Sequence, residues 1–267
     1  GVDDLRRLVA EIFAAVPVDP VQAQRFAQLL VDTELRGVVS HGVTQVERYV
    51  RSFQDGTINP DPQPRVLCEG PVTSAWSGDG GLGLWVATMA MERAIDQARQ
   101  LGVGVATTTY HGHIGSAGKY VRMALGANLI GVCMSGRSAA PSYDLEQTLH
   151  GSIQGSPPLA FGVPGGDGRA PFLLDFASHT PWDEDCFRRM PQVFIKAIGL
   201  SHVANLLSGT LGGQMLPEHD RRQIAFTAAE QSGFFLALDV ERFTPLVPFT
   251  EDVDYLMEQA RSMRPLP

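Results

Sequence analysis

The sequence predicts an α/β protein, and two patterns along the chain support that fold class. From residue 1 to residue 55, apolar side chains recur every three or four positions, which is typical of amphipathic helices. From Val72 onward, short apolar runs alternate with helical stretches, and this order favours helices packed on a sheet.

Three short helices are expected before the first strand. Asp19-Pro20 marks the start of the second helix, because Asp caps free backbone amides and Pro suits the first helical position. Ser40 is the candidate cap of the third helix, which would stop at Asp55-Gly56. The apolar stripes are Leu5, Leu8, Val9, Ile12 and Phe13, then Phe26, Leu29 and Leu30, then Val43, Val46, Tyr49, Val50 and Phe53.

The later part of the chain predicts the layer of strands and helices. Extended segments are expected at 72–76, 102–109 and 129–134, with helices at 84–100 and 116–125. Two apolar runs, 159–163 and 171–176, flank the turn Gly165-Gly166-Asp167-Gly168 and predict a hairpin. A helix at 198–211, strands at 224–227 and 234–238, and a last helix carrying Val253, Leu256, Met257 and Ala260 complete the order.

Composition argues against several classes of protein. The chain has 21 basic and 29 acidic side chains, a net charge of −8, and no basic run, so nucleic acid is not an expected partner. No apolar run approaches the ~20 residues of a membrane span, and we expect neither a membrane segment nor a signal peptide. Cys68, Cys133 and Cys186 are too dispersed for a disulfide framework, so a reducing cytoplasm is the expected compartment.

A glycine-rich segment invites comparison with dinucleotide-binding loops. Gly78-Asp79-Gly80-Gly81-Leu82-Gly83 satisfies G-x-G-x-x-G and lies between a predicted strand and a predicted helix. A Rossmann unit also needs an acidic residue at the end of its second strand, and Val103–Thr109 offers none. We therefore favour a simple turn followed by a helix start over a pyrophosphate loop.

Two histidine segments are candidates for proton transfer. In Ser40-His41-Gly42, either Ser40 merely caps a helix, or it orients His41, whose charged form the helix start would disfavour. His111 and His113 follow a predicted strand, where a loop histidine and a cleft-facing histidine are both open interpretations. No acidic residue or cysteine nearby completes a ligand set, so no metal site is expected.

Asp175 ends a predicted strand and precedes Phe176-Ala177-Ser178. Such an Asp can simply form a turn, or it can serve a site at the strand end. The chain contains no G-x-S-x-G segment, so serine-hydrolase chemistry has no support.

Taken in this order, the segments resemble the malate/L-lactate dehydrogenase family that lacks a Rossmann fold. That family includes ureidoglycolate, sulfolactate, diketogulonate and piperideine-carboxylate oxidoreductases. The matching segments are Ser40-His41-Gly42 with Tyr49, His113-Ile114-Gly115 with Ala117-Gly118 and Tyr120, Asp175-Phe176-Ala177-Ser178, and Lys196 with Gly199-Leu200.

The resemblance implies a mixed, non-Rossmann sheet that binds NAD or NADP, with a helical subdomain built from the N-terminal and later helices. It implies a homodimer that reduces a C=O or C=N group next to a carboxylate, or oxidises the 2-hydroxy acid. We expect a helical unit over 1–65, a cofactor-binding α/β layer over 66–180, and residues 181–267 completing both.

The resemblance also assigns roles to residues. His41 would donate the proton to the substrate or accept it, and Ser40 and Asp175 would form its relay. His113 would be a second active-site histidine. Hydride delivery to a carbonyl carbon leaves an alkoxide, which explains the need for such a proton donor. The cofactor would contact Asp175, Phe176, Ala177, Ser178 and Lys196.

The chain departs from the family where the substrate carboxylate would bind. Gln45 stands where relatives place the Arg that clamps this carboxylate. In a separate departure, Gly155-Ser156-Pro157-Pro158 replaces the Asn-Pro of the family's G-T-N-P segment. In one continuous helix Arg48 would face the same way as His41, so Arg48, Tyr49 and Gln45 are expected substrate contacts, with Arg137 as a second candidate. A solvated surface Arg48 is the alternative.

These departures keep a second function open. The chain would then retain the family scaffold but have lost normal cofactor use, and would act as a non-redox acid/base enzyme or as a binding protein.

Overall fold

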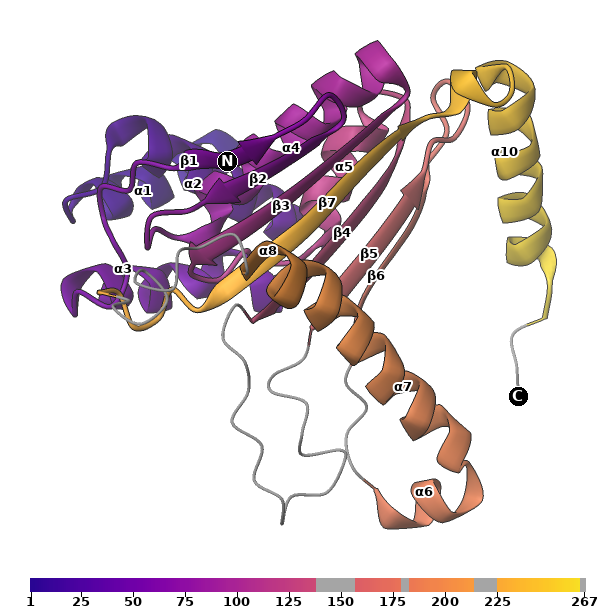
Figure 1. Cartoon of the computed structure of the whole chain (residues 1–267). Helices are drawn as coiled ribbons and strands as arrows, with labels where there is room; N and C mark the ends of the chain where they lie inside the picture. The colour runs from indigo at the N-terminus through magenta and orange to yellow at the C-terminus, as the bar shows by residue number, and fades with distance from the viewer. Residues whose placement is uncertain (138–156, 179–182, 214–224, 265–267) are drawn as a thin grey trace.

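The computed structural model describes residues 1–137, 157–178, 183–213 and 225–264, and its fold is the expected α/β class (Figure 1). Seven strands form one mixed sheet in the order β1-β2-β3-β7-β4-β5-β6. The strands are β1 (Arg65–Glu69), β2 (Thr73–Ser77), β3 (Val103–His111), β4 (Leu129–Arg137), β5 (Pro158–Val163), β6 (Phe172–Ala177) and β7 (Gln231–Asp239).

The position of β7 determines which strand ends meet. Strands β2 and β3 are parallel, and every other neighbouring pair is antiparallel. Because β7 lies antiparallel between β3 and β4, those two strands run the same way and end at the same end of the sheet. There β7 and β5 begin and β6 ends, as the pairs Arg137–Gln231 and Pro158–Ala177 show.

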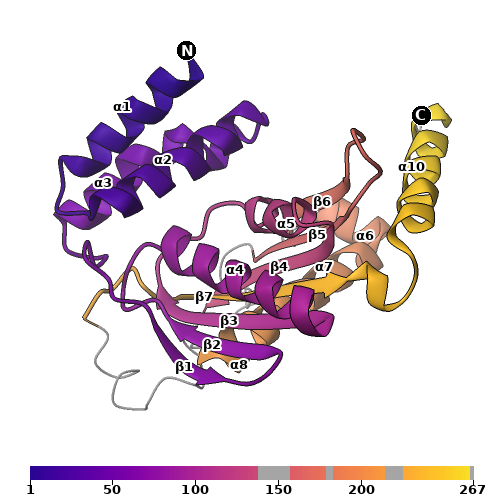
Figure 2. The same ribbon diagram turned by 90° about the horizontal axis from the view of Figure 1, so that it is seen from above.

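Helices cover both faces of the sheet (Figure 2). On one face, α4 (Gly83–Leu101) and α5 (Gly118–Leu125) bury the main core, in which the rings of Tyr120 and Phe235 meet edge to face at 5.5 Å. On the other face, α7 (Pro191–Ala204), the π-helical turn η3 (Asn205–Thr210) and α8 (Leu211–Gly213) enclose a smaller cluster of Met134, Leu159 and Ala204.

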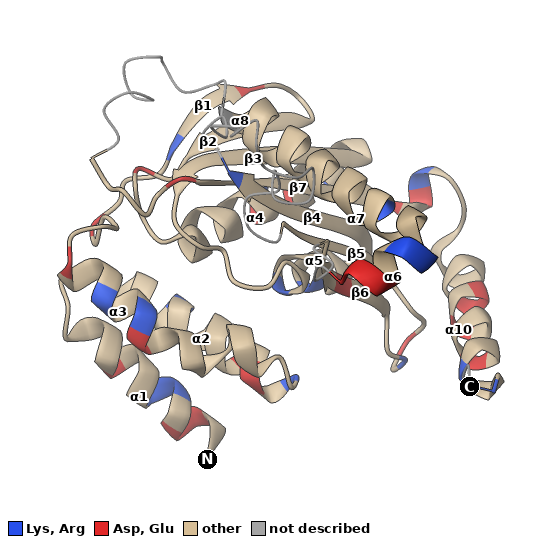
Figure 3. Cartoon of the chain, turned by 90° about the horizontal axis from the view of Figure 1, so that it is seen from below, with Lys and Arg blue, Asp and Glu red and all other residues tan. Residues whose placement is uncertain are grey.

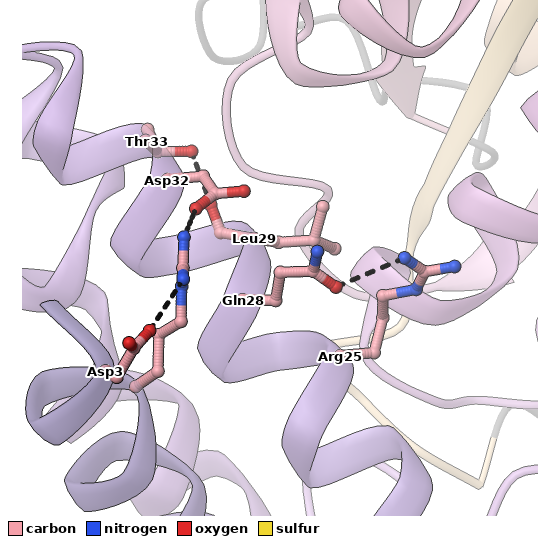
Figure 4. A network of polar contacts seen from close by, with 7 residues as sticks. Asp3, Arg25, Gln28, Leu29, Asp32 and Thr33 are labelled. Atoms are coloured by element: carbon pink, nitrogen blue, oxygen red, sulfur yellow. Dashed lines mark hydrogen bonds and ion pairs between the residues drawn. The ribbon is translucent and has the colours of Figure 1, made fainter.

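The N-terminal helices have an apolar core of their own. Helices α1 (Val2–Ala14), α2 (Pro20–Leu35) and α3 (Val46–Gln54) bury a cluster that includes Phe13, Phe26 and Leu30. Asp19 caps α2 as expected, because its carboxylate accepts from the amides of Val21 at 2.8 Å and Gln22 at 3.2 Å. Arg6 of α1 joins the two helices by donating to Asp32 of α2 at 2.6 Å (Figure 4).

Three expected elements differ from the structure. The third helix does not begin at Ser40, because Gly42 interrupts the segment with non-helical backbone (φ −92°, ψ −142°) between two 3-10 turns, Val39–His41 and Val43–Gln45. The helix expected at 198–211 already begins at Pro191. Of the strand expected at 224–227, Ile224 lies outside the described residues and the rest forms bends and a turn.

Several elements complete the chain. Strand β1 and the short helix α6 (Glu184–Arg189) have no counterpart in the sequence prediction. After the turn η4 (Val240–Arg242), α10 (Leu246–Ser262) extends away from the sheet (Figure 1).

Within the described ranges, no helix combines the length and apolar character needed to cross a membrane. Cys68, Cys133 and Cys186 are free thiols.

Candidate active site

A cavity of about 590 Å³ opens at the end of the sheet where β3, β4 and β6 finish. The segment between α2 and α3 contributes to its wall, so residues from distant parts of the sequence meet there. The lining residues are Val38, Ser40, His41, Arg48, His113, Ile114, Gly115, Ser116, Ser135, Gly136, Arg137, Pro157, Pro158, Asp175, Phe176, Ala177 and Gln231.

His41 lies in the first 3-10 turn, where Ser40 Oγ is 2.9 Å from its Nδ1 atom. Its pKa is lowered from the ordinary 6.5, mainly by partial burial and then by the positive charges of Lys119 and Arg48, while Asp175 opposes the shift. Burial therefore replaces the helix start as the reason why the neutral imidazole is favoured. The expected contact with Ser40 is present.

His113 occupies the loop after β3, and its ring centroid lies 5.6 Å from that of His41. The hydroxyl of Tyr49 is 2.7 Å from His113 Nδ1. Burial, followed by the charge of Arg48, lowers the pKa of His113 to about 3, and burial raises the pKa of Tyr49. Because Tyr49 keeps its proton, it can donate to Nδ1, which leaves the proton of His113 on Nε2.

His111, two residues earlier, is buried, does not line the cavity and has a structural role. Its ring lies 2.8 Å from Thr108 Oγ1 and 2.7 Å from the carbonyl of Gly112, which accepts from Nδ1. Burial lowers its pKa to about 4. Across the part of the chain that the structure describes, no three His, Cys, Asp or Glu side chains gather as a metal site.

Asp175 connects β6 to α5 at the cavity rim. Its Oδ2 atom accepts from the amide of Gly118 at 2.9 Å. The surrounding wall removes enough water to raise the pKa of this carboxyl, against the opposing effects of the Gly118 amide, His41 and Lys119. Ser40 is the residue in hydrogen-bond contact with His41, so Asp175 acts on His41 through its charge.

The expected substrate contacts differ in position. Arg48 lines the cavity although no continuous helix joins it to His41, and it donates to Gln45 Oε1 at 3.3 Å. Gln45 does not line the cavity, because its amide nitrogen donates to the carbonyl of Ser40 at 2.7 Å. Tyr49 is buried and reaches the cavity only through His113. Arg137 lines the cavity and is paired with Glu230 at 3.0 Å.

The expected cofactor contacts also separate into two groups. Asp175, Phe176 and Ala177 line the cavity. Ser178 is buried instead, and its hydroxyl donates to the carbonyl of Pro157 at 2.8 Å and meets Ser201 Oγ at 2.7 Å. Lys196 is exposed on α7 and does not line this cavity.

Lys119 is a residue of the site that no sequence motif indicated. This side chain is 9% exposed, and its charge acts on His41, His113 and Asp175. The sequence offered one signal for it, the rarity of lysine, because the chain contains only two lysines, Lys119 and Lys196. Of Gly155-Ser156-Pro157-Pro158, the two prolines line the cavity and the first two residues lie outside the described ranges.

This arrangement defines a site that can hold a small acidic molecule and exchange a proton with it. The family model described as malate/L-lactate dehydrogenase matches residues 1–180, and the chain belongs to that family. A malate dehydrogenase from Pyrococcus horikoshii is 30% identical over 306 aligned residues, covering 99% of this chain and 83% of the relative.

Other relatives match a shorter part of the chain. An L-sulfolactate dehydrogenase from Methanocaldococcus jannaschii is 33% identical over 175 residues, covering 65% of this chain and 49% of the relative. A ureidoglycolate dehydrogenase (NAD(+)) from Escherichia coli K12 is 32% identical over 165 residues, covering 61% of this chain and 46% of the relative.

Solved structures agree with this assignment. The structure of malate dehydrogenase from Pyrococcus horikoshii superimposes with a TM-score of 0.82 at 30% identity, covering 100% of this chain and 82% of that one. A delta1-piperideine-2-carboxylate reductase from Pseudomonas syringae shares the fold, with a TM-score of 0.76 at 18% identity, covering 100% of this chain and 90% of that one. The expected family and fold class are thus confirmed.

Proposed function

We propose that this protein is an NAD(P)-dependent oxidoreductase that reduces a C=O or C=N group next to a carboxylate, or oxidises the corresponding 2-hydroxy acid. The main support is the meeting of His41 and His113 in one cavity with Arg48 and Asp175. The names of the relatives, which are dehydrogenases of hydroxy acids, point to the same class of reaction.

The cavity suits a nicotinamide ring together with a small substrate. Its volume of about 590 Å³ lies within the ~300–1,000 Å³ of ordinary ligand pockets. Phe176 and Ala177 offer apolar surface for a flat ring, and Gln231 offers polar atoms at the start of β7. A bound nicotinamide supplies or accepts the hydride, and the remaining chemistry falls to the protein.

Proton transfer is best assigned to His41. When a carbonyl is reduced, negative charge develops on its oxygen and a positioned acid must neutralise it. His113, whose pKa burial lowers to about 3, is neutral at pH 7, so it serves as a hydrogen-bond donor through Nε2. His41 is less buried and can alternate between its two charge states, while Ser40 orients its ring.

Arg48 is the residue that would hold the substrate's carboxylate, and Arg137, which pairs with Glu230, is the second candidate. Both line the same cavity as the histidines, and a guanidinium can bind a carboxylate through two charge-assisted hydrogen bonds. Two arginines in one cavity fit a substrate with an acidic group beside the reacting carbon.

A substrate survey tests the proposed reaction. The purified chain is mixed with NADH or NADPH and a panel of 2-oxo acids and cyclic imino acids, and loss of the reduced cofactor's absorbance is followed. We expect turnover with at least one acid of the panel and its loss in the double variant His41→Ala, His113→Ala. An acid that binds without any cofactor oxidation would favour the non-redox alternative.

A further inference from the structure

A second pocket of about 270 Å³ adjoins the candidate catalytic cavity, bounded by α2, α5 and β6. The two hollows share Val38, Ser116 and Asp175 as lining residues, so a single layer of side chains lies between them. A molecule bound in the catalytic cavity therefore needs only a short extension past Asp175 to reach this pocket.

Most of the charge that faces this pocket is positive. Arg25 and Asp32 also line it, but Arg25 pairs with Glu92 at 2.8 Å. Asp32, labelled in Figure 4, accepts from Arg6 at 2.6 Å. The remaining charged residues are three basic side chains, Arg36, Lys119 and Arg122, against one acid, Asp175. Lys119 and Arg122 belong to α5, whose basic residues are blue in Figure 3.

The guanidinium groups of Arg36 and Arg122 lack competing partners among the described residues. Neither makes an ion pair there, and their charges repel each other: burial first and Arg36 second lower the pKa of Arg122, while the charge of Asp175 opposes the shift. Arg36 is exposed and Arg122 is half-buried, so an anion in the pocket can pair with both guanidinium groups through charge-assisted hydrogen bonds.

Lys119 gives the second, independent observation. Its Nζ atom is buried beneath Gly115, where an added Cβ would meet it, and within the described residues it has no hydrogen-bond partner. A buried ammonium without a partner is costly, and an ion or ligand is one of the ordinary explanations for such a group. Burial lowers its pKa to about 8, and a nearby anion would reverse this shift.

We propose that the pocket formed by Arg36, Lys119 and Arg122 binds an anionic group, a carboxylate or a phosphate, belonging to a molecule held in the catalytic cavity. The proposal rests on the proposed function for the molecule concerned. It extends that function to a substrate with a second acidic group, or to a phosphate of the cofactor.

Binding of simple anions tests the pocket without any turnover. Calorimetry of the full chain with inorganic phosphate and with succinate should detect binding of at least one of them. Arg36→Gln and Arg122→Gln should each weaken that binding about tenfold, since each removes a charge-assisted contact. Arg99→Gln, on the exposed end of α4, is the charge-matched control and should change it less than about twofold.

The two lysines provide a readout on the pocket itself. NMR of the full chain carrying 13C at the lysine Cε atoms reports Lys119 and Lys196 separately and needs no reagent to reach the buried amine. Phosphate or succinate should raise the pH at which the Lys119 signal titrates, because a bound anion favours its charged form, and should leave the Lys196 signal unchanged. This measurement needs no variant, so it stands even if Lys119→Gln fails to fold.

The outcomes separate this proposal from the proposed function. No binding of either anion, or equal binding by the Arg36→Gln, Arg122→Gln double variant, overturns the anion pocket even in an active oxidoreductase. Anion binding without any oxidation of NADH or NADPH supports the pocket and counts against the oxidoreductase. Competition by NADPH but not NADH identifies the cofactor's 2′-phosphate as the source, and competition by both identifies its pyrophosphate. Tighter binding of 2-oxo dicarboxylates than of monocarboxylates identifies the substrate.

Discussion

His41 and His113 divide the chemistry because they differ in what they can do with a proton. Burial keeps His113 neutral, while His41 retains access to both forms. His41→Ala should therefore lower turnover by ~10²–10⁴-fold, whereas His113→Ala should mainly raise the Michaelis constant. Steady-state kinetics of the two variants measure this split, and a reversed pattern would transfer the acid/base role to His113.

The pH dependence of the reaction follows from the lowered pKa of His41. Reduction needs its protonated form, so kcat/KM for reduction should fall as pH rises through a midpoint below 6.5. Oxidation needs the neutral form, so kcat/KM in that direction should rise through the same midpoint. Profiles in both directions, with His41→Gln as the comparison, check the sign; a shared midpoint above 6.5 contradicts the assignment.

Arg48 should anchor the substrate through its charge. Arg48→Ala is expected to weaken substrate binding by about 1.5–3 kcal/mol and to leave the fold intact, because the side chain is exposed. Arg51→Ala on the same helix is the matched control, since Arg51 pairs with Glu47 on the helix surface. Equal Michaelis constants for wild type and Arg48→Ala would make Arg48 a surface residue and direct attention to Arg137.

At the scale of elements, the glycine-rich segment between β2 and α4 serves packing. An added Cβ at Gly83 would lie 2.3 Å from the carbonyl oxygen of Gly112 and 2.7 Å from His111 Nδ1. The start of α4 therefore approaches the loop after β3 closely enough to exclude a side chain, which agrees with the turn and helix start expected from the sequence. This close approach of Gly83 to Gly112 and His111 supports the loop that carries His113.

This packing predicts a difference between two helical glycines. Gly83→Ala should lower the free energy of unfolding by about 1–3 kcal/mol, as overpacking does. Gly199→Ala in α7 should be neutral or stabilising, because an added Cβ there meets nothing within 4 Å and Ala favours the helix. Urea denaturation of both variants measures the difference, and equal stabilities would refute the packing argument.

At the scale of the whole molecule, the sequence predicted local structure better than assembly. Most of the strands and helices were expected, because apolar periodicity and caps such as Asp19 are local signals. The pairing of β7 between β3 and β4 was not, since the paired residues lie between 94 (Arg137–Gln231) and 135 (Val103–Leu238) positions apart in the sequence. That pairing gathers the strand ends around the cavity, so the inclusion of Gln231 was unpredictable.

The candidate site was predicted in part for the same reason. Short motifs with chemical side chains, such as Ser40-His41 and His113, pointed to residues that now line one cavity. Lys119 gave no motif, and its importance comes from burial and from its distance-dependent effects on the histidines. Gln45 was misplaced because the break at Gly42 turns its amide toward Ser40. The expected homodimer and the three sequence regions stay predictions.

Cofactor binding is a property of the assembled sheet end, and it is the most decisive prediction for the molecule as a whole. Phe176 and Ala177 at the end of β6 and Arg137 at the end of β4 contribute to one cavity, so the chain should bind NADH or NADPH with at least micromolar affinity. Titration of the cofactor's fluorescence measures this. Ala177→Trp, which fills the cavity while leaving both histidines in place, should abolish the signal. Absence of binding of either cofactor up to millimolar concentration would leave a family scaffold with a non-redox role.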